Sequence, residues 1–404
     1  MLVKGVVFRL ESGLPSEAKF LLEDFRLAVN NAIRAGLQAR VTSRNALVKI
    51  AYKDFREQHP MMYAQHLVSA FDVAGSVLKN HRRRLRNSVA CRIPFAKRLM
   101  MKAENQAYKL DRESGIIDLP IRAGCHVELR LVVSQYHRKY LDDMALSLGS
   151  LTVLSNRVIV AFRKDVPKPF APESALSLDT NERSLDGVFV EGDGAKAVKA
   201  DFPDIAVIQL RHHDRRKRLQ KKKAHDRRIS KRLCRREGTR EHGRIDYRLH
   251  QVANSVLKFA EERKSAIVLE NLTGMRPKRS KELNRRLRLW PRRKLHQIIE
   301  YKAQWKGIPV VKVDPRNSSR TCPICGRIQD SRMGTEFKCE CGWHMDRHIN
   351  ASINLLQTAI SKGMAGGLWF DPGAFQHDVM MILYEPAMAA RSEPNGTSGI
   401  VGVT

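Results

Sequence analysis

Four cysteines within twenty residues constrain the fold of this chain more than any other feature. They form two close pairs, Cys322 and Cys325 in T-C-P-I-C-G and Cys339 and Cys341 in F-K-C-E-C-G, with thirteen residues between the pairs. A glycine follows each pair, which is typical of zinc-ribbon knuckles, where thiolates hold one tetrahedral ion and glycine permits the turn. We expect a structural Zn²⁺ here, because four protein ligands leave no open coordination position.

Two details leave alternatives open at this site. The second pair is C-x-C rather than the commoner C-x-x-C, so His344 is a possible substitute ligand. Buried cysteines without a metal are the alternative to the favoured zinc site. A disulfide framework is not expected in a large, lysine-rich chain without a secretion signal, which indicates a reducing compartment. The single cysteines Cys91, Cys125 and Cys234 are expected to be small core residues.

The charge of the chain is strongly positive and unevenly distributed. Its 404 residues include 73 Lys and Arg against 42 Asp and Glu, a formal net charge of +31. Nearly all of the excess lies in residues 79–102, 211–250 and 271–294, which hold nine, seventeen and ten basic residues against none, five and one acids. Clustered charge focuses potential as a phosphate-binding channel requires. Solvated helix faces or localisation-type basic runs are the alternative for any one segment, but three such segments favour nucleic-acid binding.

Length and hydropathy exclude several other classes. The chain is long enough for two to three domains of roughly 150 residues, and its 43% hydrophobic content argues against a disordered basic tail. No stretch approaches the roughly 18 to 20 consecutive apolar residues of a membrane span. The first ten residues alternate instead of forming a signal-peptide core, so we expect a soluble, unsecreted protein.

Hydrophobic periodicity divides the chain before residue 173 into strands around a helical insertion. Residues 2–10 predict a strand, and residues 16 to about 108 carry helical spacing. Strand patterns return over residues 116–121, 127–136 and 151–162. These strands could close a small β-barrel. Residues 166–172 contain three prolines and predict a linker.

After the linker, short apolar strands alternate with helices, which predicts an α/β domain. Expected strands cover residues 175–179, 187–191, 266–270 and 308–313, and expected helices include a long basic stretch and residues 293–306. A last helix is expected from residue 346. Residues 363–404 are rich in Gly, Pro, Ala and Met without periodicity, and we expect them to be poorly ordered.

Three acids stand at the ends of these elements. Asp179 ends one apolar strand, Glu270 ends another, and Asp346 begins a helix. A carboxylate at the edge of a buried strand is costly unless it meets a cation, and Mg²⁺ prefers such oxygens. Three converging acids could hold two metals roughly 4 Å apart, as in phosphodiester hydrolysis. Each acid alone is better explained as a cap or surface group, but their joint placement beside basic segments favours catalysis.

The motifs occur in an order that resembles a known family. L-S-L-D-T-N-E-R-S surrounds Asp179, I-V-L-E-N-L surrounds Glu270, the C-P-I-C-G and C-E-C-G pairs follow, and D-R-H-I-N-A-S-I-N-L begins at Asp346. This order resembles the TnpB (OrfB) proteins of insertion sequences and the similar compact type V CRISPR effectors. The resemblance covers residues 175–356. It implies a multidomain α/β protein: a RuvC, or RNase H-like, nuclease domain with an inserted zinc ribbon, behind a β-barrel wedge domain that contains a helical insertion.

The resemblance also implies domain boundaries and functional residues. The domains would be the wedge at 1–15 and 109–168, the helical recognition domain at 16–108, the nuclease domain at 173–314 and 346–362, the zinc ribbon at 315–345 and the tail at 363–404. Asp179, Glu270 and Asp346 would be catalytic and would bind two Mg²⁺ ions, and Cys322, Cys325, Cys339 and Cys341 would bind Zn²⁺. The family's usual D-R-D is Asp346-Arg347-His348 here.

The implied function is RNA-guided cleavage of double-stranded DNA beside a short flanking motif, in the cytoplasm of a prokaryotic cell. A guide RNA with a structured scaffold would be the cofactor. The residues expected to contact nucleic acid are Arg82, Arg83, Arg84, Arg86, Arg215, Arg216, Lys217, Lys221, Lys222, Arg276, Arg279, Arg285 and Arg286.

Two other functions compete with this one. A nuclease-inactive RNA-guided DNA-binding repressor would be expected to lack triad acids, and all three are present. An unguided nucleic-acid-binding zinc protein would use its acids structurally. A DNA-strand transferase is disfavoured, because no convincing His-hydrophobe-His motif with a tyrosine occurs. Transposon-encoded and CRISPR-associated nucleases share these motifs, so both remain open.

Overall fold

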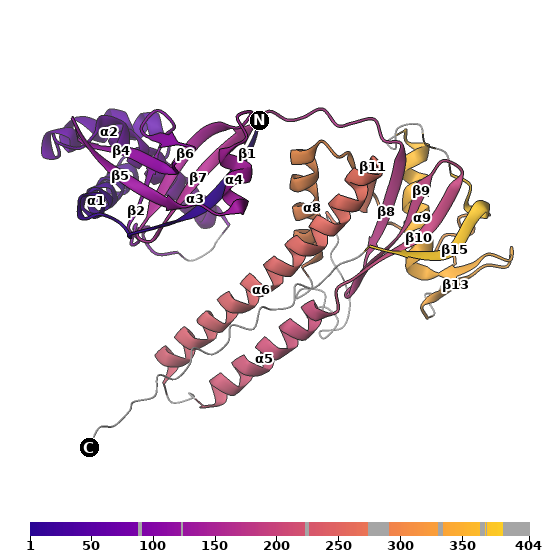
Figure 1. Cartoon of the computed structure of the whole chain (residues 1–404). Helices are drawn as coiled ribbons and strands as arrows, with labels where there is room; N and C mark the ends of the chain where they lie inside the picture. Colours follow the sequence, from indigo (N-terminus) through magenta and orange to yellow (C-terminus); the bar gives the residue numbers. More distant parts are fainter. Residues whose placement is uncertain are drawn as a thin grey trace, which may run out of the picture. The chain divides into compact units, whose positions relative to one another are not determined.

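The computed structural model describes residues 1–87, 91–122, 124–222, 226–273, 291–329, 334–363, 368 and 370–382. The chain divides into two compact units, residues 1–165 and 166–404. Each unit is built on one main β-sheet with helices packed against it (Figure 1).

The first unit contains a seven-stranded antiparallel sheet in the order β2-β6-β7-β1-β5-β4-β3. Its strands are β1 (Leu2–Leu10), β2 (Met100–Ala103), β3 (Lys109–Asp111), β4 (Ile116–Arg122), β5 (Cys125–Val132), β6 (Ser147–Leu154) and β7 (Arg157–Lys164). The pairings of the described residues end at β2 on one side and β3 on the other, so closure into a barrel stays a prediction.

Three helices lie between β1 and β2 in the chain: α1 (Ser16–Gln38), α2 (Arg44–Gln58) and α3 (Ala64–Arg86). They pack through fully buried side chains such as Phe25, Leu47 and Phe71. A fourth helix, α4 (Gln135–Leu141), replaces the end of the strand expected over residues 127–136. That expectation was wrong because Ser134 and His137 form a capping box, which starts a helix at this point.

The second unit contains a six-stranded sheet in the order β12-β11-β8-β9-β10-β15. Its strands are β8 (Ser174–Thr180), β9 (Ser184–Glu191), β10 (Gly194–Asp201), β11 (Ser265–Glu270), β12 (Val310–Val313) and β15 (Phe375–Met381). Strands β8, β11 and β12 are parallel, whereas β9 is antiparallel to both of its neighbours. Gly187 on β9 permits close pairing, since a Cβ there would lie 2.1 Å from the Ser177 carbonyl oxygen.

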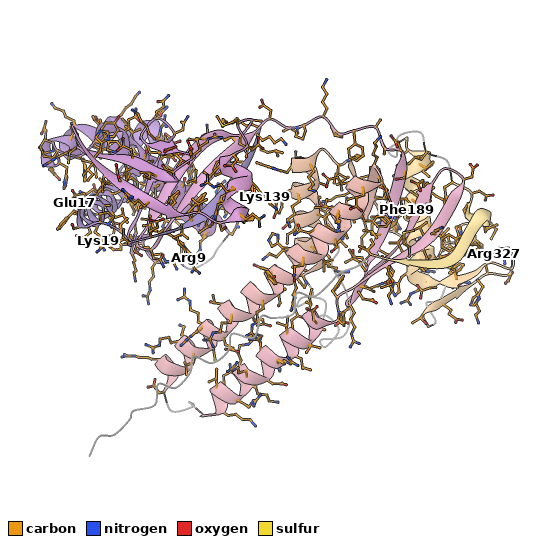
Figure 2. The ribbon with its side chains drawn as sticks, viewed as in Figure 1. Arg9, Glu17, Lys19, Lys139, Phe189 and Arg327 are labelled. Carbon is orange, nitrogen blue, oxygen red and sulfur yellow. The ribbon has the colours of Figure 1, made fainter. Side chains whose placement is uncertain are left out.

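Helices cover both faces of this sheet (Figure 1). The helices of this unit are α5 (Asp204–Lys222), α6 (Arg227–Glu262), α8 (Arg292–Lys306) and α9 (Arg347–Ser361). One face packs against α6 and α8 in a core that includes Phe189, labelled in Figure 2, whose ring meets Phe259 edge-on at 5.2 Å. Alternate strand residues point to the other face, where Val188 and Val268 pack against Ile353 of α9.

Helices α5 and α6 lie side by side and extend beyond the sheet as a helical pair (Figure 1). Both are strongly basic, as expected for residues 211–250. Throughout the described ranges, no helix is both long and apolar enough to cross a membrane.

Part of the C-terminal segment differs from its prediction. Residues 363–404 were expected to be disordered, but η1 (Pro372–Ala374) and β15 lie within them. Strand β15 pairs in parallel with β10, and the Ile382 amide donates to the Lys199 carbonyl at 2.8 Å. This strand covers an edge of β10 that would otherwise expose unpaired backbone groups.

Candidate metal centre and carboxylate site

Asp179 and Glu270 lie at the carboxyl ends of neighbouring parallel strands. Leu178 of β8 is paired with Leu269 of β11, so the residues that follow reach the same edge of the sheet. Glu270 is buried and Asp179 half-buried. Burial, followed by the negative charge of Asp179, raises the pKa of Glu270 to about 7. The two carboxyl groups are therefore close enough to interact, and they lack sufficient compensating positive charge.

Weaker effects oppose this rise in the pKa of Glu270. The positive charge of Arg292 lowers it, as do hydrogen bonds from the backbone N–H and hydroxyl of Thr180. The Thr180 hydroxyl also lies 2.7 Å from Nε2 of His296 on α8. Burial, and then the charges of Lys312 and Arg292, lower the pKa of His296 to about 4, so its ring is neutral at neutral pH.

Asp346, the third predicted acid, forms the N-cap of α9. Its Oδ1 accepts hydrogen bonds from the backbone N–H groups of His348 at 2.8 Å and Ile349 at 3.3 Å. Helix α9 is attached to the sheet through Ser352, whose Oγ donates to the Asp186 carbonyl at 2.8 Å and accepts from the Asp179 amide at 3.0 Å. This attachment brings the start of α9 to the strand end that carries Asp179.

The three acids do not form one tight cluster. In the described part of the chain, only the four cysteines bring three or more potential metal-ligating side chains within 4.8 Å of one another. A helix cap was the alternative explanation for each acid taken alone. Asp346 has this role in the structure, as the N-cap of α9. Both capping bonds use Oδ1 of Asp346, so its other oxygen could bind a metal while the cap is kept.

Sequence reasoning did not assign a contact to His348. Its Nδ1 lies 2.9 Å from Oδ2 of Asp179. Burial alone would lower the pKa of His348, but the hydrogen bond and charge of Asp179, with the charge of Asp346, raise it. The departure from D-R-D at this position was the sequence signal that could have indicated such a contact.

A fourth acid, Asp186, was also missed. It is the direct partner of Asp179 across the β8–β9 pair and is buried. Its carboxylate accepts hydrogen bonds from the Ser184 hydroxyl at 2.6 Å and from the Asn181 side chain. Only the cross-strand register reveals this proximity, because Asp186 stands inside a strand rather than at its end.

The four predicted cysteine ligands come together. The Sγ atoms of Cys322 and Cys341 lie 3.5 Å apart, as do those of Cys325 and Cys339. A tetrahedral zinc ion with Zn–S bonds of about 2.3 Å places its sulfurs about 3.8 Å apart, close to these separations. Burial raises the pKa of the Cys322 thiol, so its thiolate form needs a nearby cation. The geometry and donor set therefore fit Zn²⁺.

The backbone around the cysteines has the expected knuckle form. Gly326 and Gly342 adopt φ values of +74° and +95°, and their amides donate at 3.0 Å to the carbonyls of Cys322 and Cys339. The short strands β13 (Glu336–Lys338) and β14 (His344–Asp346) pair on either side of the second knuckle, and β14 leads directly into α9. His344 pairs with Glu336 at 3.1 Å, outside the cysteine cluster, so its proposed role as a substitute ligand is not supported.

The predicted nucleic-acid contacts fall into three groups. Arg82, Arg83, Arg84 and Arg86 are exposed at the C-terminal end of α3, where positive charge also favours the helix dipole. On α5, Arg215, Lys217 and Lys221 are exposed, whereas Arg216 is half-buried and forms an ion pair with Glu241 of α6. Arg216 therefore holds the two helices together. The structure does not describe the remaining predicted contacts, which are the side chain of Lys222 and residues Arg276, Arg279, Arg285 and Arg286.

Comparison with known proteins identifies the family. The chain is 30% identical over 247 residues to TnpB-like protein MJ0751 of Methanocaldococcus jannaschii, a match that covers 59% of this chain and 88% of that protein. The chain belongs to the TnpB-like family. Its TnpB-like sequence matches the family described as "Cas12f1-like, TNB domain" over residues 293–355, and the "Uncharacterized protein MJ0013 family" over residues 21–118. The family resemblance inferred from the motifs is confirmed.

More distant relatives share part of this TnpB-like chain. The CRISPR-associated endodeoxyribonuclease Cas12f2 of Micrarchaeota archaeon is 30% identical over 132 residues, which cover 29% of the TnpB-like chain and 24% of that enzyme. The protein in the Cas12f1–sgRNA–target DNA complex has the same fold, with a TM-score of 0.57 at 16% identity over 84% of this chain and 82% of that one. CasPhi-2 (Cas12j) bound to crRNA gives a TM-score of 0.56 at 11% identity.

Proposed function

We propose that this protein is an RNA-guided DNA endonuclease that cleaves target DNA beside a short flanking motif by metal-assisted phosphodiester hydrolysis. The observation that carries the proposal is the placement of Asp179 and Glu270 at one sheet edge in a TnpB-like chain. Burial, followed by the nearby charge of Asp179, raises the pKa of Glu270 to about 7, and a bound divalent cation would stabilise the two charged carboxylates.

The chain's own residues would bind and orient Mg²⁺ at this edge. Asp179 and Glu270 offer hard carboxylate oxygens from the ends of paired strands, and Asp346 would join them through the oxygen that does not cap α9. Two bound Mg²⁺ ions would supply activation of water and stabilisation of the leaving phosphodiester oxygen. The four cysteines would hold a structural Zn²⁺ that fixes the ribbon immediately before α9.

The guide RNA and the DNA target would account for the basic surfaces. Exposed arginines at the end of α3 and basic side chains on α5 would neutralise phosphates. Base pairing with the guide would read the target, while the protein would read only the flanking motif. The names of the Cas12f relatives and structures support this assignment, because they describe endodeoxyribonucleases and complexes with sgRNA and target DNA.

A cleavage assay with matched variants tests the proposal. The full chain is co-expressed with the transcribed DNA that flanks its gene, and the purified complex is supplied with Mg²⁺ and a target library. Asp179→Ala and Glu270→Gln should abolish cleavage without loss of RNA or target binding. Asp193→Ala is the control, because Asp193 is exposed in the turn between β9 and β10. Undiminished cutting by Asp179→Ala would overturn the assignment.

The His348–Asp179 contact favours a second candidate, a guided DNA-binding protein that does not cut. His348 contacts the Asp179 carboxylate, which a nuclease would need for binding a metal. His348 also stands where the family pattern D-R-D has its second aspartate. In that case the purified complex would bind its target with RNA and leave both strands intact at every Mg²⁺ concentration.

A further inference from the structure

A basic cavity lies on the α5–α6 helical pair, separate from the carboxylate site and the cysteine cluster. It has a volume of about 600 Å³ and is lined by His212, Arg215, Arg240, Gly243, Arg244 and Tyr247. This volume falls within the range of roughly 300 to 1,000 Å³ that is typical of ligand pockets.

The lining residues follow from helical spacing. Arg240, Gly243, Arg244 and Tyr247 of α6 occupy positions i, i+3, i+4 and i+7, which lie on one face of a helix. His212 and Arg215 of α5 are three residues apart and line the same cavity. The cavity therefore lies where one face of α6 meets α5.

Buried Glu237 holds the cavity's polar side chains in place. Its side chain is 4% exposed, and Oε1 accepts a hydrogen bond from Nδ1 of His212 at 2.8 Å. Arg215 and Arg240 lie 3.7 and 3.8 Å from the same carboxylate, and Arg244 lies 3.3 Å from Nε2 of His212. Three guanidinium groups against one carboxylate leave the cavity positive and partly pre-organised for an anion.

Gly243 has no structural requirement that explains it. A Cβ at this position would meet no heavy atom within 4 Å, and its φ is not in the left-handed region. Glycine inside a helix lowers helix stability relative to alanine. Its absent side chain instead leaves open space in the cavity wall, where a ligand can approach the backbone.

Tyr247 supplies an aromatic surface beside the guanidinium groups. The residue is 55% exposed, and its hydroxyl accepts a hydrogen bond from Gln251 at 3.3 Å. An exposed aromatic ring next to fixed positive charge is how proteins bind single-stranded nucleic acids, with bases stacked on the ring and phosphates held by cations.

We propose that this cavity binds one unstacked nucleotide of a single-stranded nucleic-acid segment. Its phosphate would lie among Arg215, Arg240 and Arg244, its sugar would pass over Gly243, and its base would stack on Tyr247. The inference deepens the proposed function and rests on it for the source of the strand. Guide RNA and single-stranded target DNA share this chemistry, and the experiment distinguishes them.

Photo-crosslinking of the full chain tests whether a nucleotide occupies this cavity. Mapping the crosslinked residue separates binding here from binding to the other basic surfaces. The probes are single-stranded oligonucleotides of one sequence, an RNA with 4-thiouridine and a DNA with 4-thiothymidine, and crosslinked peptides are mapped by mass spectrometry. We expect crosslinks at Tyr247. Gly243→Leu, which fills the cavity without removing charge, should reduce their yield about tenfold, as expected for loss of one stacked base.

The control variant is Gly238→Leu on the same helix, where a Cβ also meets nothing within 4 Å and which does not line the cavity. It should crosslink like the unmodified chain, and thermal unfolding of both variants checks that α6 remains folded. Crosslinking by the RNA probe assigns the cavity to guide RNA. Crosslinking by the DNA probe assigns it to the single-stranded DNA. Absence of crosslinks at Tyr247, or equal yields from Gly243→Leu and Gly238→Leu, would overturn the inference.

This test is independent of cleavage. A chain that crosslinks at Tyr247 but cuts no DNA contradicts the endonuclease proposal alone. A guided chain that cuts DNA but gives no crosslink at Tyr247 contradicts the cavity assignment alone.

Discussion

Nδ1 of His348 lies 2.9 Å from Oδ2 of Asp179, so the first residues of α9 directly contact the carboxylate at the end of β8. The contact uses an oxygen that a divalent ion would need. His348 also occupies the position at which the family pattern D-R-D has its second aspartate. If the proposed metal binds at this edge, His348 would compete with it directly for Asp179.

Replacing His348 by Asp should strengthen metal binding at this edge. The change removes the group that occupies Asp179 and adds a hard oxygen ligand. We expect His348→Asp to reach half-maximal cleavage at a Mg²⁺ concentration several-fold lower than the unmodified complex. The measurement is a Mg²⁺ titration of cleavage by the guided complex.

His126→Asp is the matched control for that titration, because His126 also pairs with an aspartate, Asp118, at 3.0 Å, but in the first unit. It should leave the Mg²⁺ requirement unchanged. An unaltered or higher requirement in His348→Asp would show that the histidine contact does not compete with the metal.

The cysteine cluster should hold one zinc ion per chain. Replacing Cys322 by Ser removes the buried ligand, and we expect zinc content to fall from about one to near zero per chain and the unfolding temperature to drop. Elemental analysis measures the zinc content, and thermal unfolding measures the change in unfolding temperature. His344→Ala should retain the zinc, because His344 pairs with Glu336 instead of the cluster. Equal zinc loss in both variants would instead make the histidine a ligand.

Local patterns predicted the parts of the site that depend on neighbouring residues. The cysteine knuckles were recognisable because each needs only a C-x₁₋₂-C-G stretch and a positive-φ glycine. The pairing of Asp179 with Glu270 was anticipated because both end short apolar strands. The contacts of His348 and Asp186 were not, since they depend on how α9 and β9 lie against β8.

The same distinction explains the differences in the fold. Strand β15 was missed because its seven residues show no clear alternation and are ordered by pairing with β10, more than 170 residues earlier in the chain. Helix α4 was missed because a capping box at Ser134 overrides the β-favouring residues before it. The placement of Arg216 against Glu241 depends on the register of α5 on α6, which periodicity alone does not give.

Removing Glu237 should destabilise the α5–α6 pair much more than removing an exposed acid. Glu237 is 4% exposed and pairs with buried His212 at 2.8 Å, so Glu237→Ala leaves buried polar groups without their partner. We expect a loss of about 3 kcal/mol, as is typical when one member of a buried pair is removed. Glu262→Ala removes a 54% exposed side chain that pairs with Lys258 and Arg263 at 3.7 to 3.8 Å, and should change stability by less than about 1 kcal/mol. Denaturant unfolding monitored by circular dichroism distinguishes the two, and equal effects would contradict the buried-pair assignment.

Stability of the first unit should fall as the pH drops from 6.5 towards 4 because of His66. The side chain is fully buried, Nε2 donates to the Pro120 carbonyl at 2.7 Å, and burial lowers its pKa from 6.5 to about 4. Between these values the unfolded chain binds a proton that the folded chain excludes, so up to about 3 kcal/mol of stability is lost. His66→Gln can keep a donor towards Pro120 but cannot be protonated. Urea unfolding at pH 7 and pH 4.5 should therefore show a smaller pH-dependent loss in His66→Gln than in the unmodified chain, and identical losses would assign the acid sensitivity to other groups.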